Sequence, residues 1–321
     1  MRTSALIGAA LSAALALGGP ALAAPRDAPR LVIRNAAMKV VVQPEARNDI
    51  AVQVWRPNAS LPLEVRREGG DVVIDGHLPR FLTSCHGSGD GLHVLVFGRG
   101  DFGLNEMPQV LVRAPADTVI ESGGIVHGVV ARSQSLSLDA SGCGDWTVAN
   151  VAGPLTAGVS GVGDLKTGSS QSANVSLSGT GHVTVGAVQT QLIAHLSGAG
   201  SLSARAAGAA DLTVSGSGEL STGPIAGPLS ARLSGAGNLK TASVAGPVTA
   251  DVSGVGNVRI ADGHAPTLSA QVSGTGSVSF RGVADALDAN VSGVGSVDVA
   301  RVTGSVSQHV SGIGSVHIDS R

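Results

Sequence analysis

The sequence predicts an all-β fold. It is a single-stranded parallel β-helix (β-solenoid) with about eleven regular coils of roughly 19 residues after an irregular N-terminal β region. Three observations lead to this prediction: Ser-Gly-x-Gly recurs every 18 to 20 residues, apolar and polar residues alternate around it, and no stretch keeps a helical period. A degenerate copy at Ser122 comes before ten full copies. Their serines are Ser141, Ser160, Ser178, Ser197, Ser215, Ser234, Ser253, Ser273, Ser292 and Ser311.

Apolar residues take the same positions in each repeat, and they predict the buried face of each strand. The fifth, third and first residues before the serine are apolar, as in Leu229, Ala231 and Leu233. Side chains of a strand alternate between its two faces, so these residues point inward and their polar neighbours point outward. Coils stacked about 4.8 Å apart would place the fifth residue after each serine in one interior column. The column consists of Trp146, Leu165, Val183, Leu202, Leu220, Leu239, Val258, Val278, Val297 and Val316.

The glycine-rich phrase LSGAGNLKT, residues 233–241, resembles a phosphate-binding loop at first sight. A P-loop requires Gly-x-x-x-x-Gly-Lys-Ser/Thr between a strand and a helix, and this phrase recurs in every repeat instead. We therefore interpret its glycines as the corners of the solenoid, where a positive φ or a close backbone approach favours glycine. The structural repeat glycines are Gly161, Gly163, Gly198, Gly200, Gly235, Gly237, Gly254, Gly256, Gly293 and Gly295.

The remaining chain divides by composition. A positive residue, an apolar stretch and the small-residue sequence ALA predict a signal peptide over residues 1–23, followed by a linker over 24–30. Short alternating apolar runs over 31–121 predict irregular β coils and an N-terminal cap. The regular repeats occupy 122–321, and with no Ser/Gly/Pro linker between the parts we expect one continuous domain over 31–321. We expect an exported bacterial protein of the periplasm or cell surface, with no transmembrane segment.

Composition excludes several classes of function. The chain has 46 glycines, no tyrosine, two tryptophans and a net charge of −2, with 14% charged residues. This balance provides no basic surface for nucleic acid. It also leaves few aromatic side chains from which to build a sugar-binding cleft. At 43% hydrophobic residues, the chain is too apolar to be disordered.

The densest polar cluster is the segment SCHGSGDGLH, residues 84–93. Cys85 and Cys143 are the two cysteines of the chain; in an exported protein they could form a disulfide, or they could remain free thiols. Cys85, His86, Asp90 and His93 could bind a metal or form a Cys–His site. Because their spacing matches no zinc signature, we interpret the segment as a turn-rich loop and keep His86, Asp90 and His93 only as candidate ligands.

Scattered acidic residues suggest neither calcium binding nor catalysis. Repeats that bind calcium carry an aspartate at every turn, whereas here Asp145 and Asp164 alone follow the second glycine of the motif. Asp285 and Asp288 form a pair that exposure on a solvated face explains. We therefore expect no catalytic residues, no metal and no cofactor.

Two parts of the sequence resemble a known family. PQVLVRAPADTVIESGGIVHG, followed by repeats such as VSGVGSVDV and LSGAGSLSA, is similar to the GIN-domain family, the head domains of putative auto-transporter adhesins. The resemblance covers most of residues 31–321. It implies a right-handed β-helix in an exported bacterial protein of largely unknown function, and it carries no catalytic motif.

These observations favour a non-catalytic, exported interaction or adhesion-type module of the envelope or cell surface. Its partner is unknown and could be a glycan or an envelope protein. The alternative is a structural protein that assembles into homo-oligomers through its open coil edges. A second alternative, which the composition disfavours, is a β-helix enzyme that acts on polysaccharides.

Overall fold

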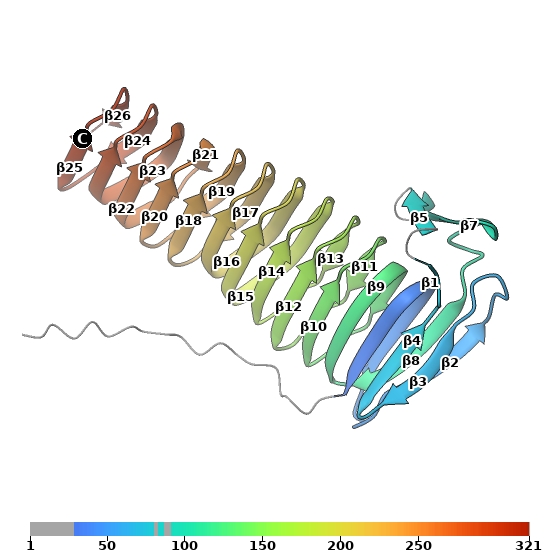
Figure 1. The fold of residues 1–321 in the computed structure, drawn as a ribbon. Helices are drawn as coiled ribbons and strands as arrows, with labels where there is room; N and C mark the ends of the chain where they lie inside the picture. Colours follow the sequence, from blue (N-terminus) through green and yellow to red (C-terminus); the bar gives the residue numbers. More distant parts are fainter. Residues whose placement is uncertain (1–28, 80–82, 87–90, 321) are drawn as a thin grey trace, which may run out of the picture.

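A computed structural model describes residues 29–79, 83–86 and 91–320 (Figure 1). Strands make up 70% of the structure and the described residues contain no helix; parallel coils of about 19 residues stack into a β-solenoid of about eleven turns. The predicted fold class is confirmed. The predicted signal peptide, residues 1–23, lies outside the described residues.

Each regular coil has one strand segment before the Ser-Gly-x-Gly corner and one after it. The strands before the corner are β10 (Ser135–Ala140), β12 (Pro154–Val159), β14 (Ser172–Leu177), β18 (Leu229–Leu233), β20 (Val248–Val252), β22 (His264–Val272) and β25 (Val306–Val310). The strands after it are β11 (Trp146–Val148), β13 (Leu165–Thr167), β17 (Glu219–Ile225), β19 (Asn238–Val244), β21 (Val255–Ile260), β24 (Ser296–Val302) and β26 (Ser315–Ser320). Four longer strands span both segments: β9 (Asp117–Val130), β15 (His182–Leu196), β16 (Ser201–Val214) and β23 (Thr275–Val291).

The interior consists of columns of aliphatic side chains, as the alternation predicts. Leu239 pairs in parallel register with Leu220 on one side and with Val258 on the other, and all three are fully buried. A second column, three residues before the serine, is mostly alanine and includes the paired residues Ala231 and Ala250. Burial of one Val or Leu side chain stabilises the fold by about 1.5–3 kcal/mol. The columns therefore supply much of the stabilisation of the stack.

The N-terminal region ends the stack with antiparallel strands. β1 (Arg30–Glu45) pairs in parallel with β9 on one side and with β4 (Asp71–Asp75) and β8 (Gln109–Pro115) on the other. Beyond these, β3 (Glu64–Glu68) lies antiparallel to β4, and β2 (Ala51–Arg56) lies antiparallel to β8. Short, charged antiparallel strands cover the parallel edge, which would otherwise be free to pair with another chain. This is the irregular β region that the sequence predicts.

A separate three-stranded sheet lies beside the first coils (Figure 1). It consists of β5 (Thr83–His86), β6 (His93–Val96) and β7 (Gly100–Gly103), all antiparallel. We call it the side sheet. The interpretation of residues 84–93 as a turn-rich loop is wrong at both ends, where β5 and β6 form. Its buried residues, Val94 and Val96 among them, pack with Ala37 and Ile125 of the first coils in a second small core.

Candidate functional site

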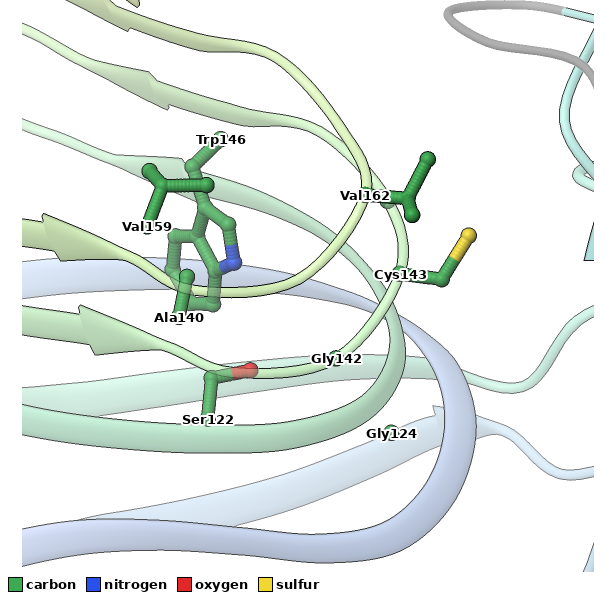
Figure 2. Close-up of a pocket in the computed structure, with 9 residues that line it drawn as sticks. Ser122, Gly124, Ala140, Gly142, Cys143, Trp146, Val159 and Val162 are labelled. Carbon is green, nitrogen blue, oxygen red and sulfur yellow. The ribbon is translucent and has the colours of Figure 1, made fainter. Parts of the chain in front are cut away.

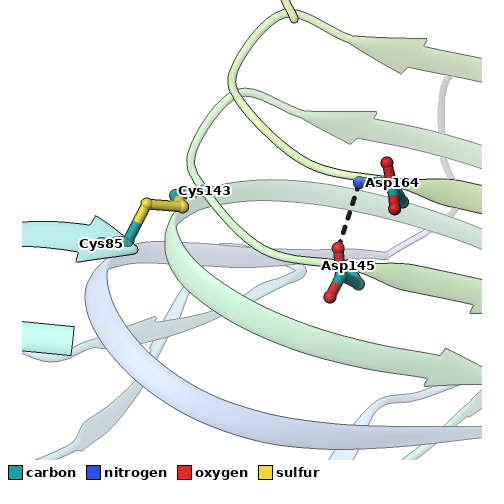
Figure 3. The surroundings of a disulfide bond; sticks show 4 residues. All are labelled: Cys85, Cys143, Asp145 and Asp164. Atoms are coloured by element: carbon teal, nitrogen blue, oxygen red, sulfur yellow. Dashed lines mark hydrogen bonds between the residues drawn. A yellow bond between two sulfur atoms is a disulfide. The ribbon is translucent and has the colours of Figure 1, made fainter. Parts of the chain in front are cut away.

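A disulfide joins the side sheet to the solenoid (Figure 3). Cys85 lies in β5, and Cys143 is the x residue of the first full Ser-Gly-x-Gly corner; their Cα atoms are 6.5 Å apart. The sequence left open whether these cysteines are bridged or free. A link across 58 residues stabilises a fold by about 4 kcal/mol when only the lost freedom of the unfolded chain is counted. The bridge holds the side sheet against this corner, and Cys85 offers no thiolate to a metal or a substrate.

The side sheet brings together two of the three candidate ligands that the sequence suggested. His86 and His93 pair directly across β5 and β6, and their rings stack with centroids 5.4 Å apart. Asp90 lies outside the described residues. Asp101 of β7 completes the cluster, and sequence reasoning missed it. One sequence signal could have placed Asp101 beside the histidines. The alternating run HVLV, a turn that contains glycine, and then GDFG together form the pattern of a β-hairpin.

Asp145 and Asp164 have a structural role (Figure 3). The backbone N–H of Asp164 donates to Oδ1 of Asp145 at 3.1 Å, and that of His182 donates to Oδ1 of Asp164 at 2.9 Å. Each carboxylate therefore accepts a hydrogen bond from the backbone of the next coil. This pattern continues the stacking of the corners, and the two side chains do not converge on a common point.

Asp285 and Asp288 each bind different partners. Asp285 accepts hydrogen bonds from His264, whose Nε2 is 3.0 Å away, and from Thr303 at 3.1 Å. The bond with His264 contributes most to holding the pKa of Asp285 below its ordinary value. Asp288 is exposed and lies 3.4 Å from the side-chain amide of Asn290. The two acids therefore do not form the converging pair that general acid–base catalysis requires.

Polar side chains form a row on the outer face of the strands that follow the corners. The amide of Asn257 donates to Oδ1 of Asn238 at 3.1 Å, and the hydroxyl of Ser277 donates to Oδ1 of Asn257 at 2.6 Å. We call Asn238, Asn257 and Ser277 the polar row. Two residues after Asn238 on the same strand, Lys240 forms an ion pair at 2.7 Å with Glu219, which pairs with Asn238 from the preceding coil. The surface is thus rich in hydrogen-bonding groups and carries little unbalanced charge.

A second row runs along the corners themselves. The x residue of Ser-Gly-x-Gly points outward. In the first coils, x residues of adjacent coils are joined by isolated β-bridges, Cys143 with Val162 and Val162 with Thr180. The large apolar members have 52–82% of their surface exposed; they are Val162, Val255, Val294 and Ile313. We call these four residues the corner row. Sequence reasoning treated this position only as a variable letter, although aliphatic residues recur there.

A small hollow lies inside the corner next to the disulfide (Figure 2). Ser122, Ala140, Trp146 and Val159 line it, together with glycines of the first corners. It has room for about one water molecule. The hollow therefore does not provide a binding site for an organic substrate.

The fold and these surfaces define the class of protein: a β-solenoid whose exterior carries polar side chains on successive coils and exposed aliphatic side chains at several corners. Residues 203–301 match the family model described as "Putative auto-transporter adhesin, head GIN domain". The resemblance to this family is confirmed over those residues. Among the described residues, no helix is long and apolar enough to cross a membrane.

Comparison with known proteins adds two solved structures and no curated relative. A putative adhesin from Bacteroides fragilis is 13% identical; the match covers 90% of this chain and 92% of that chain, with a TM-score of 0.38. A putative cell adhesion protein from Clostridium sporogenes is 8% identical, with coverage of 92% and 93% and a TM-score of 0.20. No curated protein matches this sequence.

Proposed function

We propose that this chain is an exported, non-catalytic, adhesion-type module that binds glycans or envelope proteins through the outer surface of its solenoid. The observation that carries the proposal is the polar row, in which Asn238, Asn257 and Ser277 present hydrogen-bonding groups on successive coils. The family match over residues 203–301 and the predicted signal peptide support it further.

The spacing of the coils suits repeated ligands. Adjacent coils lie about 4.8 Å apart, so equivalent side chains recur at that interval along the rod. One hydrogen bond contributes only about 0.5–1.5 kcal/mol net in water, and a single contact would be weak. Many contacts along one rod, or many rods on one surface, raise avidity without any new kind of contact. We therefore expect weak binding by single chains and strong binding when chains are displayed together.

The corner row adds an apolar element to this surface. Val255 and Val294 have 60% and 52% of their surface exposed, and their corners lie two coils apart. Exposed aliphatic residues in line with hydrogen-bonding groups fit the apolar face of a sugar ring or a strand of a partner protein. The absence of tyrosine is consistent with this mode of contact, because it relies on aliphatic rather than aromatic surfaces.

A binding experiment with multivalent display tests the proposal. Beads carrying many copies of the full chain, and the free chain, would be applied to glycan arrays and to immobilised envelope extract, with a parallel screen for polysaccharide hydrolysis. We expect retention of the beads, weak retention of the free chain and no hydrolysis. Hydrolysis would overturn the non-catalytic assignment, and failure of the beads to bind either surface would overturn the adhesion-type assignment.

Matched variants locate the surface. Asn257→Lys combined with Ser277→Lys places two long cations in the polar row, and we expect bead binding to fall at least about tenfold, which corresponds to 1.4 kcal/mol. Ser269→Lys combined with Gln271→Lys makes the same charge change on the outward positions of β22, the strand before the corner. Equal loss of binding in both variants would mean that the polar row is not the contact surface.

Self-assembly is the second candidate function. Among the described strands, none pairs with the outer edge of β25 and β26, and Val310 of the last coil is 42% exposed. Sedimentation of the full chain over a wide concentration range tests this candidate. Polymers that form as the concentration rises would favour self-assembly. A monomer at every concentration would count against self-assembly and favour the adhesion-type role.

A further inference from the structure

The outer face of the side sheet gathers two histidines and one aspartate from three different strands. His86 ends β5, His93 begins β6 and lies directly opposite it, and Asp101 lies in β7 opposite Leu95. Along β6, Val94 and Val96 are buried while His93 and Leu95 are half-buried or exposed. The alternation thus places His93, and the residues paired with His93 and Leu95, on the side facing solvent.

The distances within this cluster are too long for hydrogen bonds. Nε2 of His86 lies 3.7 Å from Oδ2 of Asp101, and Nδ1 of His93 lies 3.6 Å from Oδ1 of the same carboxylate. An N–H···O hydrogen bond joins atoms 2.7–3.2 Å apart. Moreover, Nδ1 of His93 is shielded from solvent and has no hydrogen-bond partner among the described residues. A shielded imidazole nitrogen without a hydrogen bond is in a position to bind a ligand that lies between it and the carboxylate.

The same distances suit a metal ion. Zn²⁺ binds imidazole nitrogen and carboxylate oxygen at about 2.0–2.2 Å, so two ligands of a tetrahedral ion lie about 3.3–3.5 Å apart. The two nitrogen–oxygen separations, each to a different oxygen of Asp101, exceed this by a few tenths of an ångström, and one ligand atom from each of the three residues lies within 4.8 Å of the others. Rotation of these exposed side chains about their χ angles would bring the three ligand atoms to the distances that one ion requires.

The backbone around the cluster is held in place. The neighbour of His86 in β5 is Cys85, which the disulfide ties to Cys143 of the solenoid corner. At the end of β7, the backbone N–H of Gly103 donates to the carboxylate of Glu106 at 2.8 Å. A scaffold fixed before binding reduces the entropy lost when a ligand is ordered, and this favours affinity.

We propose that His86, His93 and Asp101 form a surface site for one divalent transition-metal ion of the Zn²⁺ class. Two imidazoles and one carboxylate select such ions over Ca²⁺ and Mg²⁺, which prefer oxygen ligands throughout. Three protein ligands on a solvent-exposed face leave at least one coordination position for water or for a donor atom of another molecule. The site therefore has a coordination position open to another ligand, unlike a structural metal site in which protein side chains fill every position.

Titration of the full chain, free of any affinity tag, tests this site. Isothermal calorimetry with Zn²⁺ and absorption spectroscopy with Co²⁺ should both give one equivalent bound, and excess Ca²⁺ should not displace the ion. Loss of one ligand in His93→Gln or in Asp101→Asn should weaken binding at least tenfold, since losing even an outer-shell partner costs about 10–100-fold. Two independent ligand variants are used so that a folding defect in one does not decide the result.

His264→Gln is the matched control, because His264 is also an exposed histidine beside an aspartate, Asp285, on a regular coil. It should bind Zn²⁺ as the unmodified chain does, and circular dichroism should show that all variants keep their strands. Three results would each overturn the proposal. They are the absence of a one-to-one Zn²⁺ isotherm, unchanged affinity in both ligand variants, and displacement by Ca²⁺ at comparable concentration.

Discussion

The indole ring of Trp146 occupies the space into which a side chain on Gly128 would project. The two residues are paired in register between β11 and β9, so Gly128 is the position in the first coil that corresponds to the aliphatic column. A large side chain in one coil is thus matched by the absence of a side chain in the coil below. This pair lies where the N-terminal region, through β9, meets the first residue of the regular aliphatic column, Trp146.

The pairing predicts strong coupling between the two positions. Gly128→Ala should destabilise the chain by about 1–3 kcal/mol, because the new methyl group overlaps the Trp146 ring. In a Trp146→Leu background the same change should cost little, since the smaller side chain leaves room for it. Urea unfolding of the four proteins of this double-mutant cycle measures the coupling, which we expect to exceed about 0.5 kcal/mol. Additive effects would show that the ring and the glycine do not compete for the same space.

Side chains of β21 and β23 alternate between the interior and solvent, so an aspartate should destabilise the chain strongly at an inward position and only slightly at an outward one. Val258 is fully buried between Leu239 and Val278, so Val258→Asp should cost at least about 3 kcal/mol by leaving a charge unpaired in the column. Ser277, in the polar row, is half-buried and its hydroxyl bonds Asn257, so Ser277→Asp should cost at most about 1 kcal/mol. Melting temperatures provide the comparison, and equal losses would contradict the facing of these strands.

Gly256 predicts a steric rather than a conformational penalty, because its φ lies outside the left-handed region. A Cβ on Gly256 would meet the carbonyl oxygen of Gly237 in the preceding coil, well inside van der Waals contact. Gly256→Ala should therefore destabilise the chain by about 1–3 kcal/mol, as overpacking does. Ser253→Ala in the same motif removes an exposed hydroxyl and should stay within about 0.5 kcal/mol. Chemical denaturation that ranks the two variants in the reverse order would exclude close packing as the reason for glycine.

The sequence was sufficient for the columns but not for the side sheet. Val258 and Leu239 recur at fixed offsets from the serine, and a period of two assigns their facing without any tertiary information. Asp101 has no such periodic context, because its partners His86 and His93 reach it only through antiparallel pairing of strands with irregular spacing. Gly128 was equally hidden, since it follows a degenerate copy of the motif and is explained only by the Trp146 ring above it.

An ion pair at the N-terminal end predicts a dependence of stability on pH. Arg30 bonds Asp71 through Nη2 at 2.6 Å and Nε at 3.0 Å, and this hydrogen bonding holds the pKa of Asp71 below its ordinary value. A carboxyl whose pKa is lower in the folded than in the unfolded state contributes stability above its unfolded pKa, about 3.9. That contribution is lost as the pH falls through the folded pKa.

Asp71→Asn should therefore be less stable than the unmodified chain near neutral pH, with the difference shrinking as the pH drops below about 4. Asp49→Asn is the control, because Asp49 bonds Arg47 within a single exposed turn. Urea unfolding at a series of pH values gives the two curves. Parallel curves for Asp71→Asn and the unmodified chain would show that the Arg30–Asp71 pair does not contribute to the pH dependence.

A polar residue at an inward position of the last described coil predicts that end-to-end association of two chains is disfavoured. Gln308 pairs with Ala289 and so takes the inward position at which the preceding coils carry alanine. A second chain stacking on this edge would bury the Gln308 amide without a fixed partner, which costs about 1–3 kcal/mol. Gln308→Ala should remove that barrier and promote self-association, visible as a rise in sedimentation coefficient with concentration. Ser307→Ala, on the outward side of the same strand, should leave sedimentation unchanged. If Gln308→Ala remains as monomeric as the control, polar blocking of this edge is not what governs association.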